Sequence, residues 1–318
     1  MKKIVVIGGG TGTYTVLKGL KNYDVNITAI VSMADDGGST GVLRDEFGIL
    51  PPGDIRKCVV ALSESTKVMK DLFQYRFKNG AINGHSLGNL LITALQDITG
   101  SYEGAIKAAS KILNIKGMVL PVSFSDCRLC AELEDGQVIT GETNIDLPKH
   151  NGNLKINKIF LKPSAMVNPK ALEVIEHADL IVIGPGDLYS SLISNLVVEG
   201  IPGAIKSSKA KKVYVCNLMT KFGETNNFKA SDFLKEIEKY LGKDILDHII
   251  VNKSEYYLEL LKKYEEEKAY PVIIDNVNYK TITADLITQP ILIRHDSDKL
   301  AKEIVRLVNY SYPNTSRC

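Results

Sequence analysis

The sequence predicts an α/β fold with a mostly parallel sheet, helices on both faces and a small antiparallel β insertion. Short, nearly all-apolar runs rich in β-branched residues, such as Lys3–Ile7 and Asn26–Met33, are typical of strands buried on both faces. These runs alternate with segments of helical periodicity, the pattern of a Rossmann-like parallel sheet. Between residues 125 and 162 apolar and polar residues alternate instead, which indicates the β-rich insertion.

Composition narrows the class of protein. The 318 residues include 39 Lys and Arg against 37 Asp and Glu, for a net charge of +2, and 44% are hydrophobic. This is the composition of a globular protein, here expected as one domain over residues 1–318. The near-neutral charge gives no general case for nucleic-acid binding. Without a run of 18 apolar residues or a signal-peptide core, we expect no membrane span and a cytoplasmic location.

The first part of the chain alternates between strands and helices. After the strand Lys3–Ile7, the pattern predicts a helix over Thr13–Leu20 and a second strand over Asn26–Met33. Residues 34–53 are rich in Gly, Asp and Pro, so we expect a long functional loop there. Asp54 is expected to be the N-cap of a helix over Ile55–Ser63. Further helices are expected over Lys67–Phe77, Leu87–Ile98 and Tyr102–Leu113, and a strand over Val119–Ser123.

The insertion and the second part of the chain follow. Strands over Arg128–Leu133 and Gln137–Thr140 are joined by Asp135-Gly136, a hairpin signal, and Asn153–Leu161 alternates again. Later helices are expected over Pro169–His177, Leu188–Val198, Asp232–Leu241, Tyr256–Lys268 and Asp298–Val308. Later strands are expected over Leu180–Ile183, Val213–Asn217, Ile249–Val251, Val272–Ile274 and Ile291–Ile293.

A glycine-rich loop joins the first strand to the first helix. In open α/β sheets, ligands bind beyond the carboxyl ends of the strands. Glycines let the backbone approach a phosphate, and a helix start offers free N–H groups. The loop departs from G-x-G-x-x-G because its third position is Thr13, and no Walker A lysine follows. A tight turn that binds nothing is the alternative. The candidate phosphate-binding residues here are Gly9, Gly10, Thr11, Gly12 and Thr13.

An acidic loop follows the second strand. Asp35 and Asp36 precede glycines and hydroxyls, a pattern that suits Mg²⁺ held by carboxylate and phosphate oxygens. A single acid at this place would also suit a ribose, which leaves an NAD-binding protein as an alternative. An Asp-Gly surface turn is the structural alternative. Gly37, Gly38 and Ser39 are candidate phosphate contacts.

Two further motifs, Pro51–Arg56 and Gly84–Asn89, supply arginines and a histidine. Arginines near glycine-rich loops are natural phosphate partners, although a surface ion pair explains each one equally well. A lone histidine is more often structural than a proton donor or ligand contact. The candidates are Arg44, Gly53, Asp54, Arg56, His85 and Asn89.

The last motifs follow two later strands. Gly184–Ser191 and Asn217–Thr225 place glycines and polar residues at strand ends far along the chain from the first loop. This arrangement argues for a diphosphate-bearing ligand shared between loops. Arg294 could contact that diphosphate or pair with Asp296. The other candidates are Gly184, Gly186, Asp187, Leu188, Tyr189, Ser190, Asn217, Thr220, Glu224 and Thr225.

Taken together and in order, these motifs resemble the CofD/YvcK family across essentially the whole chain. One branch of that family is the Mg²⁺-dependent 2-phospho-L-lactate transferase, which uses a nucleoside-diphosphate-activated donor. The other is the YvcK-like branch of gluconeogenesis factors, which bind UDP-sugars and are linked to carbon metabolism, cell shape and envelope synthesis. The sequence is similar to the second branch. The motifs are GGGTG, DDGGSTG, PPGDIR, GHSLGN, GPGDLYSS and NLMTKFGET.

The resemblance implies a regulatory protein that binds a UDP-sugar or a related nucleoside diphosphate. It also implies protein partners in envelope synthesis, and the oligomeric state stays open. The transferase, with Asp35 and Asp36 holding Mg²⁺, is the first alternative, and NAD binding is the second. No arrangement of residues is diagnostic of catalysis, so we predict ligand binding without turnover.

Overall fold

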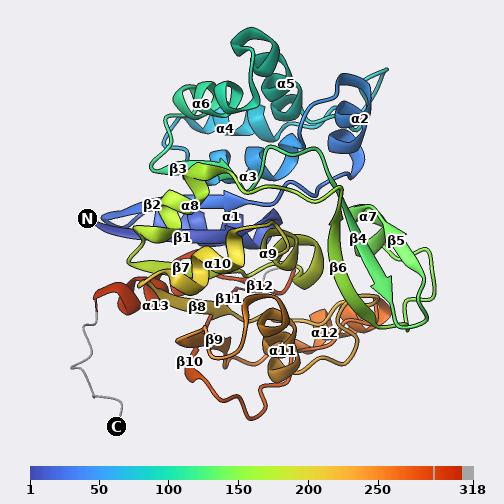
Figure 1. The fold of residues 1–318 in the computed structure, drawn as a ribbon, viewed down its shortest axis with the longest axis vertical. Helices are drawn as coiled ribbons and strands as arrows, with labels where there is room; N and C mark the ends of the chain where they lie inside the picture. Colours follow the sequence, from blue (N-terminus) through green and yellow to red (C-terminus); the bar gives the residue numbers. More distant parts are fainter. Residues whose placement is uncertain (289–290, 310–318) are drawn as a thin grey trace.

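The computed structural model describes residues 1–288 and 291–309. Its centre is a seven-stranded sheet in which every pairing is parallel (Figure 1). The strand order is β10-β9-β8-β7-β1-β2-β3. The strands are β1 (Lys2–Gly8), β2 (Val25–Val31), β3 (Met118–Pro121), β7 (Leu180–Ile183), β8 (Lys211–Val215), β9 (His248–Asn252) and β10 (Lys280–Ala284).

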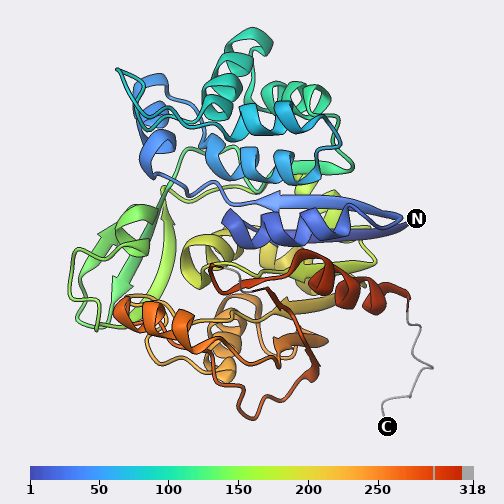
Figure 2. The ribbon, with the colours of Figure 1, turned by 180° about the vertical axis from the view of Figure 1, so that it is seen from behind.

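Helices cover both faces of this sheet, which confirms the predicted fold class. α8 (Pro169–Glu176), α9 (Ser194–Leu196) and α10 (Ile201–Ser207) lie on the face seen in Figure 1. α1 (Gly10–Leu20) and α13 (Ser297–Asn309) pack together on the opposite face, shown in Figure 2. The remaining helices of the main body are α2 (Gly38–Phe47), α3 (Pro52–Leu62), α4 (Lys67–Gln74), α5 (Leu87–Thr99), α6 (Tyr102–Ile112), α11 (Ala230–Leu241) and α12 (Leu258–Glu266).

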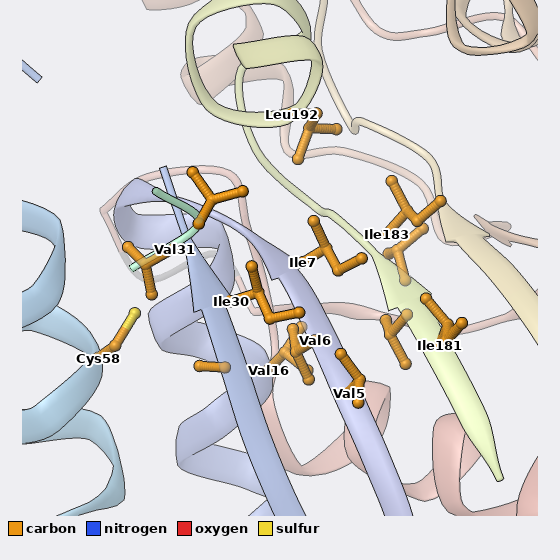
Figure 3. Packing of buried hydrophobic residues seen from close by; sticks show 14 of the residues in the cluster. Val5, Val6, Ile7, Val16, Ile30, Val31, Cys58, Ile181, Ile183 and Leu192 are labelled. Carbon is orange, nitrogen blue, oxygen red and sulfur yellow. The ribbon is translucent and has the colours of Figure 1, made fainter. Parts of the chain in front are cut away.

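The winding of the chain places a crevice beside β1. From β1 the chain builds β2 and β3 outward on one side, then returns to β7 on the other side and continues to β10. In the register, Ile7 of β1 lies beside both Ile30 of β2 and Ile183 of β7 (Figure 3). Leu192 packs above these strand ends in the same view. The direction of winding reverses between β1 and β7, and ligands of such sheets bind at that point.

The predicted β insertion is confirmed as a three-stranded antiparallel sheet, in the order β5-β4-β6. Its strands are β4 (Arg128–Leu133), β5 (Val138–Thr140) and β6 (Ile156–Lys162), and the short helix α7 (Glu142–Asp146) follows β5. The backbone N–H of Ile159 donates to the Tyr240 hydroxyl of α11, which ties the insertion to the main body. A two-stranded ribbon, β11 (Ile287–Thr288) with β12 (Arg294–His295), lies near the end of the described chain.

The expected long loop after β2 is wrong, because it contains helix α2. The glycines of this segment weaken its helical signal in the sequence. Gly41 is nevertheless required within the helix, because a Cβ at this position would overlap the carbonyl oxygen of Asp36. Asp54 is not an N-cap, since α3 begins at Pro52 with Pro51 before it. Proline suits the first turn of a helix, where its missing N–H has no partner to lose.

Other element predictions also need correction. Residues 272–274 form no strand and make only an isolated bridge through Ile273, while the second short strand lies at Arg294–His295 rather than 291–293. The segment 188–198 begins as a π-helix, Leu188–Ile193, labelled η1. The prediction missed α7, α10, β10 and β11. In these places tertiary contacts decide the backbone state more than local periodicity does.

The expectation about membranes can be compared with the described residues. Within them, no helix is both long enough and apolar enough to cross a membrane. Cys127 and Cys130, the CxxC pair of the sequence, are free and buried.

Candidate functional site

A cleft of about 360 Å³ opens at the carboxyl ends of β1 and β7, where the winding reverses. Parallel strands bring their following loops to one edge of the sheet, so loops distant in sequence meet there. The predicted site residues that line it are Gly9, Gly10, Thr11, Gly12, Asp35, Asp54, Gly186, Asp187, Asn217 and Arg294.

The first wall is the start of helix α1. Gly9 precedes the helix in extended backbone, and no side chain caps the N-terminus. Gly10 has φ +64°, a conformation that favours glycine. Gly12 touches the second loop so closely that a Cβ would overlap the carbonyl oxygen of Pro185. The first-turn N–H groups, with the positive end of the helix dipole, therefore form a surface suited to an anion.

The second wall is the loop after β7, held by Asn217. The Asn217 amide donates to the Gly186 carbonyl at 2.8 Å, and its oxygen accepts from the Tyr214 hydroxyl at 3.0 Å. Gly184 has φ +81° and turns the chain at the end of the strand. Asn217 thus fixes the loop after β7 from the loop after β8. Two of the six motifs, Gly184–Ser191 and Asn217–Thr225, therefore meet at this edge of the sheet.

Carboxyl groups crowd the third side of the cleft. Asp35 accepts from the backbone N–H of Gly37 at 3.0 Å and from the Thr40 hydroxyl at 2.9 Å. Burial and the nearby charge of Asp54 raise the pKa of Asp35 to about 6. Burial and the charge of Asp35 are also the leading causes that raise the pKa of Glu142 to about 9. Acidic groups that raise one another's pKa are a good environment for a divalent cation.

Two cations line the same cleft. The Lys57 ammonium lies 2.9 Å from Asp54 Oδ1. Burial opposes its charged form, but the charges of Asp54 and Asp35 outweigh burial and raise the pKa of Lys57. Arg294 is exposed at the other side of the cleft, in β12. Both line the cleft, where they can contact an anion.

Asp36 and Arg44 lie outside this lining. The two oxygens of Asp36 accept the backbone N–H groups of Glu142 at 3.1 Å and Thr143 at 2.9 Å, which anchors α7 against the acidic loop. Arg44 is 4% exposed and donates to Asp126 at 2.6 Å and to the Cys127 carbonyl. In this arrangement both side chains hold the insertion in place, and the metal role predicted for Asp36 stays a prediction.

A buried polar network gathers the residues of three other motifs. Arg56 donates to Asn89 Oδ1 at 2.8 Å and to the Phe73 carbonyl at 3.1 Å. Asn89 donates to Ser39 at 3.3 Å, and the Ser39 hydroxyl lies 3.2 Å from His85 Nδ1. The network joins α2, α3 and α5.

Glycine and threonine candidates also serve the packing. A Cβ on Gly53 would overlap the Asp35 carboxylate. Gly37 donates its N–H to that same carboxylate, Gly38 has φ +43°, and Thr13 is fully buried behind Gly8. These residues shape the cleft from behind its lining.

The remaining candidates of the last two motifs lie in the π-helix η1 or in the segment 220–225. Leu188, Tyr189 and Ser190 are buried. Glu224 accepts the backbone N–H of Tyr189 at 3.3 Å. Thr220 accepts the N–H of Tyr270, and Thr225 accepts that of Lys221, each at 2.9 Å.

Lys221 occupies a carboxylate trio that sequence reasoning missed. Asp146, Asp187 and Glu224 are, among the described residues, close enough together to hold a metal ion. The Lys221 ammonium lies 3.3 Å from Asp187, 3.2 Å from Glu224 and pairs with Asp146. Burial opposes the charged form of Lys221, but the charges of the three carboxylates outweigh burial and raise the pKa of Lys221. The lysine already supplies the cation of this trio.

Several lining residues were not predicted. Lys57 had a signal in the sequence, because it lies one helical turn after Asp54. Tyr264, Ile293 and Glu142 come from segments without any motif, so nothing in the sequence pointed to them. The full set comprises Thr15, Lys57, Glu142, Asp146, Pro185, Ser191, Leu218, Met219, Tyr264, Ile293 and His295.

Known proteins are similar to this chain in sequence and in fold. Residues 4–292 match the family model for 2-phospho-L-lactate transferase CofD. The chain is 44% identical to the gluconeogenesis factor of Bacillus subtilis over 314 residues, 96% of this chain and 98% of that protein. It is 46% identical to the gluconeogenesis factor of Halalkalibacterium halodurans over 313 residues, 96% of each chain.

A solved structure also has a similar fold. A crystal structure of a UPF0052 family member from Bacillus halodurans matches with a TM-score of 0.92 and 45% identity, covering 96% of this chain and 100% of that one. The sequence matches and the shared fold both extend over nearly the whole chain, including the loops that form the cleft. The chain therefore belongs to the CofD/YvcK family, among the gluconeogenesis factors.

Proposed function

We propose that the cleft binds the diphosphate of a UDP-sugar or a related nucleoside diphosphate. The observation that carries this proposal is the meeting of the Gly9–Gly12 and Gly184–Asp187 loops at the reversal of winding between β1 and β7. In the proposed role the chain is a regulatory protein linked to carbon metabolism, cell shape and envelope synthesis. Its relatives named gluconeogenesis factor support the metabolic part of that role.

The lining suggests how the ligand is held. First-turn N–H groups of α1 take the phosphate oxygens, and Lys57 and Arg294 balance their charge. Asp35 and Asp54 offer the hard oxygen donors that Mg²⁺ prefers, and the raised pKa of Asp35 fits a site that gains from a cation. Mg²⁺ bound there would neutralise charge on the ligand phosphates.

A Mg²⁺-dependent transferase is the second candidate. The acidic side of the cleft and the match to a transferase family model favour it. Such an enzyme also needs an acceptor held beside the donor phosphate, because its catalysis is mostly positioning and electrostatics. The acceptor-side candidates of the sequence are His85, Asn89 and Arg294. His85 and Asn89 are engaged with Ser39 and Arg56, while Arg294 lines the cleft, where it can contact the diphosphate instead. We therefore propose binding without turnover.

Calorimetry tests the binding proposal. We expect saturable binding of UDP-N-acetylglucosamine and a loss of affinity of about tenfold or more in Lys57→Ala, which removes one charged contact. Lys235→Ala is the matched control, since Lys235 pairs with Asp232 at the same i,i+3 spacing outside the cleft. Equal affinity in the two variants would place the ligand elsewhere. GDP and NAD titrated in parallel decide between the nucleotide classes.

Two further measurements separate the metal and transferase ideas. If EDTA leaves the affinity for the UDP-sugar unchanged, the ligand is bound without a metal. Incubation with a phospholactyl donor and a deazaflavin acceptor should form no product above a no-protein control. If the unmodified protein forms product steadily and Asp35→Asn does not, the proposal of binding without turnover is wrong and the chain is a transferase.

A further inference from the structure

A second cavity, of about 610 Å³, lies behind the π-helix η1. Its lining comes from the segment that begins β6, from the segment 222–228, from α11 and from residues 268–270. Tyr189 and Glu224, which the sequence singled out as ligand contacts, line this cavity and not the cleft at β1 and β7. The volume is in the range that holds a small molecule.

The lining combines aromatic, amide and cationic side chains. Phe222 and Tyr270 contribute aromatic rings to the lining, and Asn157 contributes an amide. Lys155 and Lys268 are exposed at the cavity, and no ion pair to a carboxylate is found for either within residues 1–288 and 291–309. The Lys268 ammonium lies 4.5 Å from the centre of the Phe222 ring.

This combination suits a phosphorylated sugar. Lysines provide charge for a phosphate, amides and carboxyls bind hydroxyls, and aromatic rings pack against the apolar face of a sugar ring. Glu236 adds a carboxyl group to the lining. A purely apolar ligand would leave these polar groups without partners, which costs binding free energy.

Contacts connect this cavity to the cleft. The Tyr189 N–H donates to Glu224, whose other oxygen lies 3.2 Å from the Lys221 ammonium. Lys221 lies in turn 3.3 Å from Asp187, which lines the cleft. Tyr189 also belongs to the same π-helix as Ser191, another lining residue of the cleft. Single π-helical turns recur at functional sites.

We propose that this cavity is a second binding site, for a phosphorylated sugar, and that its occupancy changes the affinity of the cleft through Tyr189, Glu224 and Lys221. The binding part is independent of the proposed function. The coupling part rests on it, since it needs a nucleotide ligand in the cleft.

The binding part is tested by calorimetry on the full chain with glucose 6-phosphate, ribose 5-phosphate and fructose 1,6-bisphosphate. We expect saturable binding of at least one of them, weakened about tenfold or more by Lys268→Ala. Lys262→Ala, an exposed lysine of α12 outside the cavity, is the matched control and should bind as the unmodified protein does. Lys57→Ala in the cleft should also leave this affinity unchanged.

Each contrary outcome overturns one part of the proposal. Absence of binding by all three sugar phosphates overturns the site. Inorganic phosphate binding as tightly as the sugar phosphates overturns the assignment to a sugar. Full affinity in Lys268→Ala, or lost affinity in Lys57→Ala, overturns the location. Circular dichroism of each variant shows whether it is folded.

The coupling part is tested by titrating UDP-N-acetylglucosamine with and without a saturating amount of the bound sugar phosphate. We expect the Kd to change by about fivefold or more, with a reciprocal change for the sugar phosphate. Glu224→Gln should reduce this factor, because it weakens the link to Lys221. An unchanged Kd overturns the coupling. If the UDP-sugar binds under neither condition, the proposed function fails while the second site stands on its own data.

Discussion

Arg44 and Arg56 differ from Lys57 and Arg294 in what surrounds their charged groups. The two arginines of the first pair are 4% and 7% exposed, and their donors point to protein oxygens such as Asn89 Oδ1 and the Phe73 carbonyl. Lys57 and Arg294 line the cleft. Arg56 and Lys57 are neighbours in sequence, yet they contact different parts of the molecule.

This difference shows how helix geometry separates buried cations from cations that line the cleft. Successive residues of an α-helix point about 100° apart, so α3 turns Arg56 into the polar network and Lys57 into the cleft. A buried guanidinium needs acceptors on all sides, because an unpaired buried charge is costly. The Nε and Nη2 donors of Arg44 and the Nε and Nη1 donors of Arg56 are occupied by protein oxygens, which leaves them unavailable to a ligand. We therefore expect the first pair to govern stability and the second pair to govern binding.

The largest expected effect is on binding, at Gly10. Gly10→Val should raise the Kd for UDP-N-acetylglucosamine more than about 100-fold, because a branched side chain covers the first-turn N–H groups. Gly136→Val is the matched control: its φ of +86° compares with +64° at Gly10, and it lies at a hairpin with open space around it. Both should lose about 1–2 kcal/mol of stability from backbone strain. Similar affinities in the two variants would contradict the cleft as the ligand site.

The next effect is on stability, at Arg56. Arg56→Met should lower the free energy of unfolding by about 3 kcal/mol, because Asn89 and the Phe73 carbonyl lose a charged donor while buried. Arg128→Met, which breaks the partly exposed pair with Asp45, should cost less than about 1 kcal/mol. Denaturant titration measures both. If Arg56→Met folds but loses tenfold in ligand affinity, Arg56 contributes to binding. That result would contradict the expectation that the buried arginines govern stability alone.

The smallest effect is a pH dependence at Asp35. Its pKa in the folded protein, about 6, is raised above the ordinary value of 3.8, so the folded state holds this proton more tightly. The resulting stability is complete below about pH 4 and is lost as pH rises to about 6. Asp35→Asn should remove this contribution.

The pH measurement compares the two proteins directly, because Glu142 and other groups titrate in both. The difference in unfolding free energy between Asp35→Asn and the unmodified protein should grow in favour of the variant from pH 4 to 7. Mg²⁺ should stabilise the unmodified protein more than the variant. A constant difference across this range would show that Asp35 has an ordinary pKa.

The prediction of elements succeeded where one local signal dominated. β-branched apolar runs identified β1, β2, β7 and β9, and the Asp135-Gly136 turn identified the hairpin. It failed at α2, where glycines needed for close packing against Asp36 disguised a helix. It failed also at β10, which has no buried residue, and at β11, which is only two residues long.

The sequence alone determined that a parallel sheet would form and that glycine-rich loops would stand at its strand ends, because strand, helix and turn preferences are local. Only the tertiary structure decided which polar side chains face the cleft. It turned Asp35 toward the cleft and Asp36 toward Glu142 and Thr143 of the insertion, and it brought Tyr264 and Ile293 into the same cleft as Gly10. Those positions depend on contacts between segments that are far apart along the chain. No local pattern encodes which partner a polar group will meet when the winding reverses between β1 and β7.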